Sequence, residues 1–169
     1  GTARVERRVA DREARWNLLA GLAHQLDDGR ILSARLEFLQ RDEDRGARSR
    51  RMATRVGAAW RPAGSRWTVL NRLDLVLEER DEADFDSATG KVVNNLSANF
   101  RPDERSQLSL SWGLKYVRAE IDGETYGGVT DLYGFEYRRY FARRWDLGLH
   151  GGALHSWNAS VVDWQSGAS

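Results

Sequence analysis

The sequence has no cysteine, almost no net charge and no long apolar run, and each lack excludes a class of protein. Without cysteine, the 169 residues contain no disulfide framework and no thiolate metal site. Lys and Arg total 26 against 25 Asp and Glu, so the net charge of +1 gives no strong field that would attract nucleic acid. No window approaches the roughly 18 consecutive apolar residues of a transmembrane helix. Phosphate-loop, dinucleotide and zinc motifs are also missing, so we expect no cofactor and no metal.

What the sequence does have is alternation of apolar and polar residues over segments of about ten residues, without a sustained helical period. Short turn sequences recur every 35–40 residues, at 27–30, 62–65, 102–105 and 142–144. Longer charged segments, typical of loops, alternate with these turns at 41–50, 79–90 and 118–128. We predict an all-β antiparallel up-and-down meander of hairpins, with eight full strands and the start of a ninth near Trp164.

The two ends of the chain are interpreted from the same pattern. Residues 1–13 are heavily charged and lack a sustained alternation, so we predict a charged loop that leads into the first strand. Residues 14–169 are predicted to form one β domain. We expect this domain to be a piece of a longer chain, because the alternation stops inside the ninth strand.

The segment 50–78, RRMATRVGAAWRPAGSRWTVLNRLDLVLE, is predicted to be a hairpin with one apolar and one arginine-bearing face. Pairing across the turn at 62–65 places Trp60 opposite Trp67 on the apolar face. The same register sets Arg55 opposite Arg72, a like-charge pair that needs a carboxylate between its members. Asp74, on the same face, is the expected bridge, with Glu37 as a second candidate.

Aromatic residues of the apolar faces fall at both ends of the predicted strands, as in the aromatic girdles of outer-membrane barrels. Beside the longer loops lie Trp16, Phe38, Tyr116, Tyr133 and Trp157. Beside the short turns lie Trp60, Trp67, Phe100, Phe141 and Trp145. A soluble sandwich has no reason to sort aromatic residues in this way. We therefore predict a transmembrane β-barrel, which could be part of a larger barrel.

The opposite faces are small or polar, and on a barrel they would line the lumen. Their charges are Arg35, Glu37, Arg51, Arg55, Arg72, Asp74, Glu78, Lys115, Glu136 and Arg138. These residues could form an ion-selective lining, or a network of mixed sign that fills a narrow lumen and joins the strands. The near balance of signs favours the network.

Three further candidates for chemistry are weaker. His155, with Ser156, Asn158 and Asp163 nearby, superficially offers a hydrolase set, but His155 shares its face with Trp157 and points away from any cleft. His24 and His150 have no identifiable partner. The acidic segment 79–90 lacks the spacing of a calcium-binding loop, which favours a solvated loop.

Asn71 is the one misfit on the apolar face of the hairpin, because an amide exposed to hydrocarbon costs a few kcal/mol unless it has a partner. We consider a contact with another subunit, with another part of the barrel, or with neighbouring side chains of the same sheet.

Four segments resemble the C-terminal β-barrel region of large surface proteins of Gram-negative bacteria, which are repeat-containing or OmpA-like outer-membrane proteins. These segments are NRLDLV (71–76), VVNNLSANFRPDERSQLSLSWGLKYVR (92–118), TDLYGFEYRR (130–139) and RWDLGLHGGALHSWN (144–158). The resemblance covers most of residues 14–169 and brings no catalytic residues with it.

This resemblance and the strand pattern together imply a non-catalytic outer-membrane anchor or translocator of a larger surface protein. The expected partners are outer-membrane lipid and lipopolysaccharide, together with further strands of the same or another chain. A small porin-like channel and a barrel-type hydrolase are the alternatives.

Overall fold

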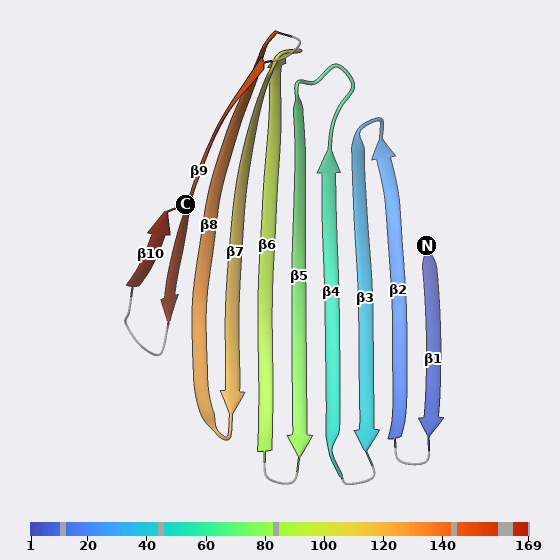
Figure 1. Ribbon diagram of the computed structural model, residues 1–169. Helices are drawn as coiled ribbons and strands as arrows, with labels where there is room; N and C mark the ends of the chain where they lie inside the picture. Colours follow the sequence, from blue (N-terminus) through green and yellow to red (C-terminus); the bar gives the residue numbers. More distant parts are fainter. Residues whose placement is uncertain (11–12, 44–45, 83–84, 143–144, 159–163, 169) are drawn as a thin grey trace.

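One antiparallel sheet accounts for nearly all of the chain (Figure 1). The computed structural model describes residues 1–10, 13–43, 46–82, 85–142, 145–158 and 164–168. Within these residues ten strands lie side by side in the order of the sequence. The strands are β1 (Thr2–Ala10), β2 (Glu13–Asp27), β3 (Arg30–Glu43), β4 (Arg48–Trp60), β5 (Trp67–Glu82), β6 (Phe85–Asp103), β7 (Ser106–Ile121), β8 (Glu124–Ala142), β9 (Trp145–Asn158) and β10 (Trp164–Ala168). The predicted all-β meander is confirmed.

The charged loop predicted for residues 1–13 is wrong, because Thr2–Ala10 forms β1 and pairs with the first half of β2. Its one acid, Glu6, lies between two arginines on the same face of the strand. Glu6 forms ion pairs with Arg4 at 3.2 Å and with Arg8 at 2.5 Å, all on one face. A high density of charge is thus compatible with a strand when opposite signs recur every second residue.

The long loops predicted at 41–50, 79–90 and 118–128 are wrong for a similar reason. Their charged residues extend the strands, and Asp42 of β3 binds Arg48 of β4 at 3.0 Å. Strands β7 and β8 are joined by Asp122 and Gly123 alone. Both residues have positive φ, 50° and 81°, as a two-residue hairpin turn requires. The last short turn predicted, at 142–144, lies largely outside the described residues.

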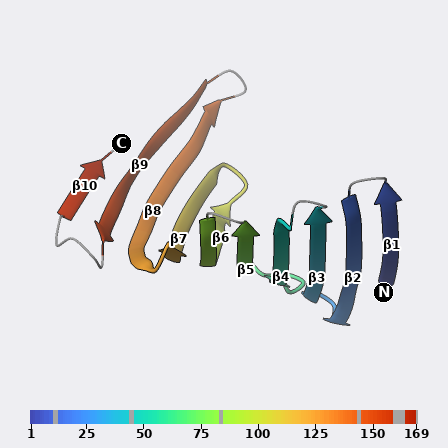
Figure 2. The same ribbon diagram turned by 90° about the horizontal axis from the view of Figure 1, so that it is seen from below.

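The sheet is open. Strands β1 and β10 lie at its opposite edges, and no ladder joins them within the described part of the chain (Figure 2). A barrel closed within these residues is therefore not what the structure has. No hydrophobic side chain is buried among the described residues. The molecule exposes 12855 Å², whereas a compact protein of this mass exposes about 8,400 Å².

The two faces predicted for each strand are continuous across the sheet. One row of paired residues on the apolar face runs through Ala20, Leu36, Thr54, Leu75, Val92, Tyr116, Val129 and Trp157. The row beside it, on the other face, runs through Leu19, Glu37, Ala53, Val76, Lys91, Val117 and Gly128. We call these sides the apolar face and the polar face.

The short-turn ends of the strands are staggered in one direction. Trp60 pairs with both Arg30, which begins β3, and Val69, so β5 begins two residues beyond the start of β3. The ladders place the start of β7 two residues beyond that of β5, and the start of β9 two residues beyond that of β7. The hairpin ends in Figure 1 accordingly rise from β2–β3 to β8–β9. The stagger is one residue per strand.

Candidate functional site

The register predicted for the central hairpin is wrong by two residues. Trp60 pairs with Val69, and Arg55 pairs with Asp74. The connection is longer than expected and runs from residue 61 to residue 66. The Arg61 amide does not bond across the hairpin but donates to the Gly29 carbonyl of the neighbouring turn, at 2.6 Å. A shift of two residues keeps every side chain on its predicted face.

The carboxylate expected between Arg55 and Arg72 is confirmed. Asp74 accepts from the Nε of Arg55 at 2.5 Å through one oxygen, and it lies 2.9 Å from the Nε of Arg72 through the other. The Asp74 side chain is 16% exposed, against 52% and 53% for the two arginines. Arg35 lies directly opposite Arg55. Asp74 thus offsets the positive charge of Arg55 and Arg72 on two adjacent strands.

Most other charges predicted to line a lumen are also paired on the polar face. Their ion pairs are Arg35–Glu37 at 3.7 Å, Arg51–Glu78 at 3.3 Å and Glu136–Arg138 at 3.3 Å. Lys115 is on the same face but forms no ion pair with any described residue. We call the part of the polar face on β3–β5 the charged half; its residues are Arg35, Glu37, Arg51, Arg55, Arg72, Asp74 and Glu78.

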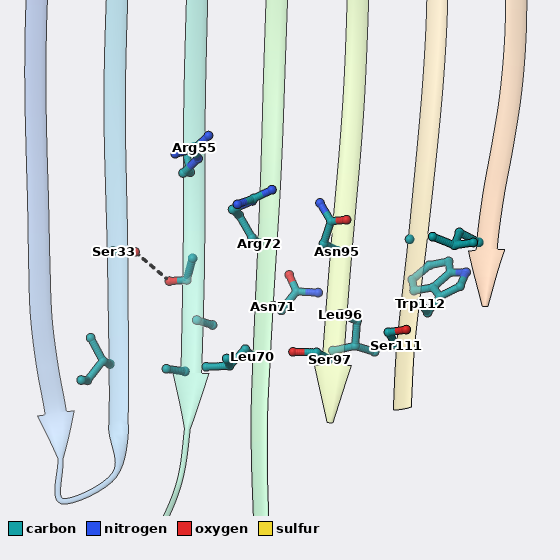
Figure 3. A pocket seen from close by; sticks show the side chains of 16 residues that line it. Ser33, Arg55, Leu70, Asn71, Arg72, Asn95, Leu96, Ser97, Ser111 and Trp112 are labelled. Atoms are coloured by element: carbon teal, nitrogen blue, oxygen red, sulfur yellow. Dashed lines mark hydrogen bonds between the residues drawn. The ribbon is translucent and has the colours of Figure 1, made fainter. Parts of the chain in front are cut away.

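The polar face of β6–β9 differs, because serine and glycine are frequent on it, beside a few longer side chains such as Lys115, Glu136 and Arg138. We call this part the small-residue half; its residues are Ser97, Ser109, Ser111, Gly113, Gly134, Gly148 and Gly152. The Ser111 side chain lies close to Gly134: a Cβ built on Gly134 would lie 2.5 Å from the Ser111 Oγ. A shallow hollow of about 560 Å³ spans the boundary between the two halves (Figure 3). Arg55 and Arg72 line it on one side, with Ser97 and Ser111 on the other.

The predicted girdle residues lie on the apolar face, and most are exposed. Trp145, at 76%, is the most exposed of them. Trp67 and Phe100 stack with ring centroids 4.6 Å apart, a pair between β5 and β6 that the sequence analysis did not predict. The Arg139 guanidinium lies 5.5 Å from the Phe141 ring centroid at the short-turn end. Arg7 of β1 lies 4.8 Å from the Trp16 ring at the other end.

Asn71 has a partner within the sheet. Its amide nitrogen donates to the Asn94 Oδ1 at 3.1 Å, and the Asn94 amide donates back to the Asn71 Oδ1 at 3.4 Å. Sequence reasoning missed Asn94, although both amides are on apolar faces of successive strands. The reciprocal pair meets the need that motivated a contact with another subunit, and such a contact stays a prediction.

The hydrolase set suggested around His155 is not assembled. Ser156 lies on the polar face and its hydroxyl is 2.9 Å from that of Thr130, while Asp163 lies outside the described residues. On the apolar face, His155 instead has its Nδ1 3.4 Å from an oxygen of Asp131, which the sequence analysis did not single out. Tyr133 donates to the other Asp131 oxygen at 3.4 Å.

The described ranges contain no cluster of three or more acidic, histidine or cysteine side chains that could hold a metal ion. None of the described segments is a helix long and apolar enough to cross a membrane. The described acidic residues of 79–90 belong to the ends of β5 and β6, where Asp81 pairs with Asp86, and Asp84 lies outside the described residues.

In comparisons with known proteins, no protein family, curated protein or solved structure matches this chain.

Proposed function

We propose that this sheet is part of the wall of an outer-membrane β-barrel that anchors or translocates a larger surface protein and performs no catalysis. The observation that carries the proposal is the apolar face, which continues across the sheet, and none of the described residues forms a second layer over it. Monomeric soluble proteins rarely expose apolar patches of more than a few hundred Å². A lipid bilayer covers such a face without any further protein layer.

The polar face supports lipid rather than a second sheet as the cover. In a soluble sandwich, one face packs in the core and the other is solvated. Here the face that would be solvated includes serine and glycine stretches and a hollow, which is what a lumen lining requires. Aromatic residues near the short-turn ends, such as Trp67 and Phe100, fit one interface of a bilayer, whereas Tyr133 lies at the middle of β8 rather than at its end.

The stagger supports a tilted wall. Strands of a barrel must tilt and shift in register for the sheet to close, and an eight-stranded barrel with a shear of eight has strands tilted by about 36°. That shear is one residue per strand, the value found from β3 to β9. Membrane barrels tilt their strands by about 35–45°.

The open edges require partners in this proposal. Unpaired backbone groups are not tolerated in hydrocarbon, where each costs several kcal/mol. The free edges of β1 and β10 must therefore pair with each other, or with further strands of the same or another chain. Cross-linking between cysteines engineered into β1 and β10 can test whether these two edges pair with each other.

A matched pair of arginine substitutions in β5 tests the proposal. Leu73 is on the apolar face and Leu70 on the polar face. Arginine near the middle of a bilayer costs about 2–4 kcal/mol on a lipid-facing position. We expect Leu73→Arg to prevent insertion of the full chain into liposomes, measured as a trypsin-resistant fragment, and Leu70→Arg to insert normally. Equal effects of the two, or a wild-type chain that folds without lipid, would contradict a membrane wall.

A small channel is the second candidate function, and the hollow on the polar face is the observation that favours it. The ion pairs across β3–β5 favour a filled lumen instead, because paired charges neither attract ions nor leave space for them. Planar-bilayer recordings separate the two: an anchor gives no stable conductance, whereas a large ion-selective open state would establish the channel.

A further inference from the structure

The apolar face has its own hollow, on the part of the sheet formed by β6–β9. Its volume is about 600 Å³. Its floor contains Ala98, Gly151 and Ala153, and its walls include Leu110, Trp112 and Phe135. The Phe135 ring lies over Gly151, where a Cβ would come within 2.7 Å of a ring carbon. The absence of a side chain at Gly151 therefore shapes this hollow.

A positive charge lies at the short-turn end of the same strands. Arg139 is on the apolar face of β8, between Ser106 of β7 and Leu147 of β9. It forms no ion pair with any described residue. The charge of Arg139 acts on Asp103, whose carboxylate accepts a hydrogen bond from the Arg105 amide at 2.8 Å. That hydrogen bond, helped by those from Ser106 and by the charge of Arg139, holds the pKa of Asp103 below its ordinary value.

The spacing of the hollow and the charge matches a phospholipid. Arg139 follows Phe135 by four residues on one strand, a separation of about 13 Å at a rise of ~3.3 Å per residue. An acyl chain in the hollow would extend toward the middle of the apolar face, with its phosphate at the rim beside Arg139. Arginine binds phosphate well because its planar fork matches phosphate oxygens.

We propose that this hollow and Arg139 together bind one phospholipid with a net negative headgroup, with one acyl chain against Phe135 and Gly151. The proposal rests on the membrane wall described above and adds a selective site to it. A peptide is a poorer occupant, because the backbone groups under the hollow are paired in the ladders β6–β7, β7–β8 and β8–β9.

Native mass spectrometry of the full chain, with phosphatidylglycerol or phosphatidylcholine titrated into detergent, tests the site. We expect one phosphatidylglycerol to bind more tightly than phosphatidylcholine. Arg139→Gln should weaken phosphatidylglycerol binding about tenfold and remove the preference, whereas Arg139→Lys should retain part of it. Gly151→Leu should weaken both lipids equally, because it fills the hollow without changing charge.

Two controls keep the result specific. Arg118→Gln removes an arginine from the apolar face at the opposite end of β7. Gly148→Ala changes a glycine of β9 where a Cβ would meet nothing within 4 Å. Both should bind lipid as the wild type does. Soluble glycerol phosphate should not compete, because it lacks the acyl chain.

The outcomes separate this inference from the proposed function. If the wild type inserts into liposomes but shows no headgroup preference, or if Arg139→Gln and Gly151→Leu bind lipid unchanged, the lipid site is wrong and the wall stands. A second copy of the chain bound in place of lipid would overturn the site in the same way. If the wild type fails to insert, both ideas fail.

Discussion

The charged half and the small-residue half occupy the same face of one sheet but differ in the size and charge of their side chains. On β3–β5, large cations lie close together, and Asp74 lies between two of them. On β6–β9, side chains are so short that Ser111 lies against Gly134 without room for a Cβ. In a closed wall the long side chains of one half would extend toward the short ones of the other. The difference favours a narrow, filled lumen over a wide pore.

The largest effect is expected where the charged half depends on one group. Asp74→Ala would leave Arg55 and Arg72 without a counter-charge, with Arg35 directly opposite Arg55. Hydrogen bonds to charged groups contribute about 1.5–3 kcal/mol, so we expect the free energy of unfolding to fall by about 2 kcal/mol. Urea unfolding of the two proteins in lipid, monitored by tryptophan fluorescence, measures this difference in the free energy of unfolding.

A control for this prediction comes from the exposed pair Glu136–Arg138 in the other half of the face. Glu136→Ala should cost less than about 1 kcal/mol, as exposed ion pairs usually do. Equal losses for Asp74→Ala and Glu136→Ala would show that the charged half has no special dependence on Asp74.

A smaller effect is expected from overfilling the small-residue half. Gly134→Val should lower the free energy of unfolding by about 1–2 kcal/mol, because the added atoms meet Ser111. Gly148→Val, at a position with open space, should be close to neutral. Adding Ser111→Gly to Gly134→Val should restore part of the loss, and failure of that rescue would remove close packing as the cause.

The smallest effect on the free energy of unfolding is expected from substituting two carboxylates at strand ends. Asp42 lies on β3, a strand of the charged half, and Asp103 lies on β6, a strand of the small-residue half. The hydrogen bond from the Gln40 amide, followed by that from Arg48, lowers the pKa of Asp42. A lowered pKa in the folded state adds stability above the unfolded value of about 4, which is lost as pH falls through the folded pKa.

The Asp42 side chain is about one-third exposed and Asp103 is exposed, so Asp42→Asn and Asp103→Asn should each cause only a slight loss of stability at neutral pH. The loss should disappear as the pH falls through the lowered pKa of the folded state, where the carboxylates become protonated in both states. Unfolding curves of the two variants at neutral and acidic pH check the sign. A loss that persists in acid would point to packing rather than charge.

The strands and their two faces could be predicted because alternation is local and every register in the sheet preserves it. The exact pairing of the central hairpin could not, because the turn is lengthened by a backbone hydrogen bond from Arg61 to Gly29, far away in the sequence. Strand β1 was missed because a high density of charge was interpreted as a loop, although Glu6 pairs with both Arg4 and Arg8 within the strand.

The candidate sites were predictable to different extents. The alternation of residues along each strand was enough to place Arg55, Arg72 and Asp74 on one face. The prediction that Asp74 bridges the two arginines was therefore correct although the register was wrong. Cross-strand pairs such as Asn71 with Asn94 depend on diagonal neighbours, which need the exact register. Grouping His155 with Ser156 failed because adjacent residues of a strand point to opposite sides.

The stagger of one residue per strand carries a rule of arithmetic for any closed form of this wall. A circuit around the wall returns to its starting strand displaced by as many residues as there are strands. An even displacement brings apolar positions back to apolar positions, whereas an odd one would turn lipid-facing side chains toward the lumen at the seam. If the same step continues around the circuit, only an even number of strands can complete it. The ten strands in sequence satisfy that condition, and so would any addition made in whole hairpins.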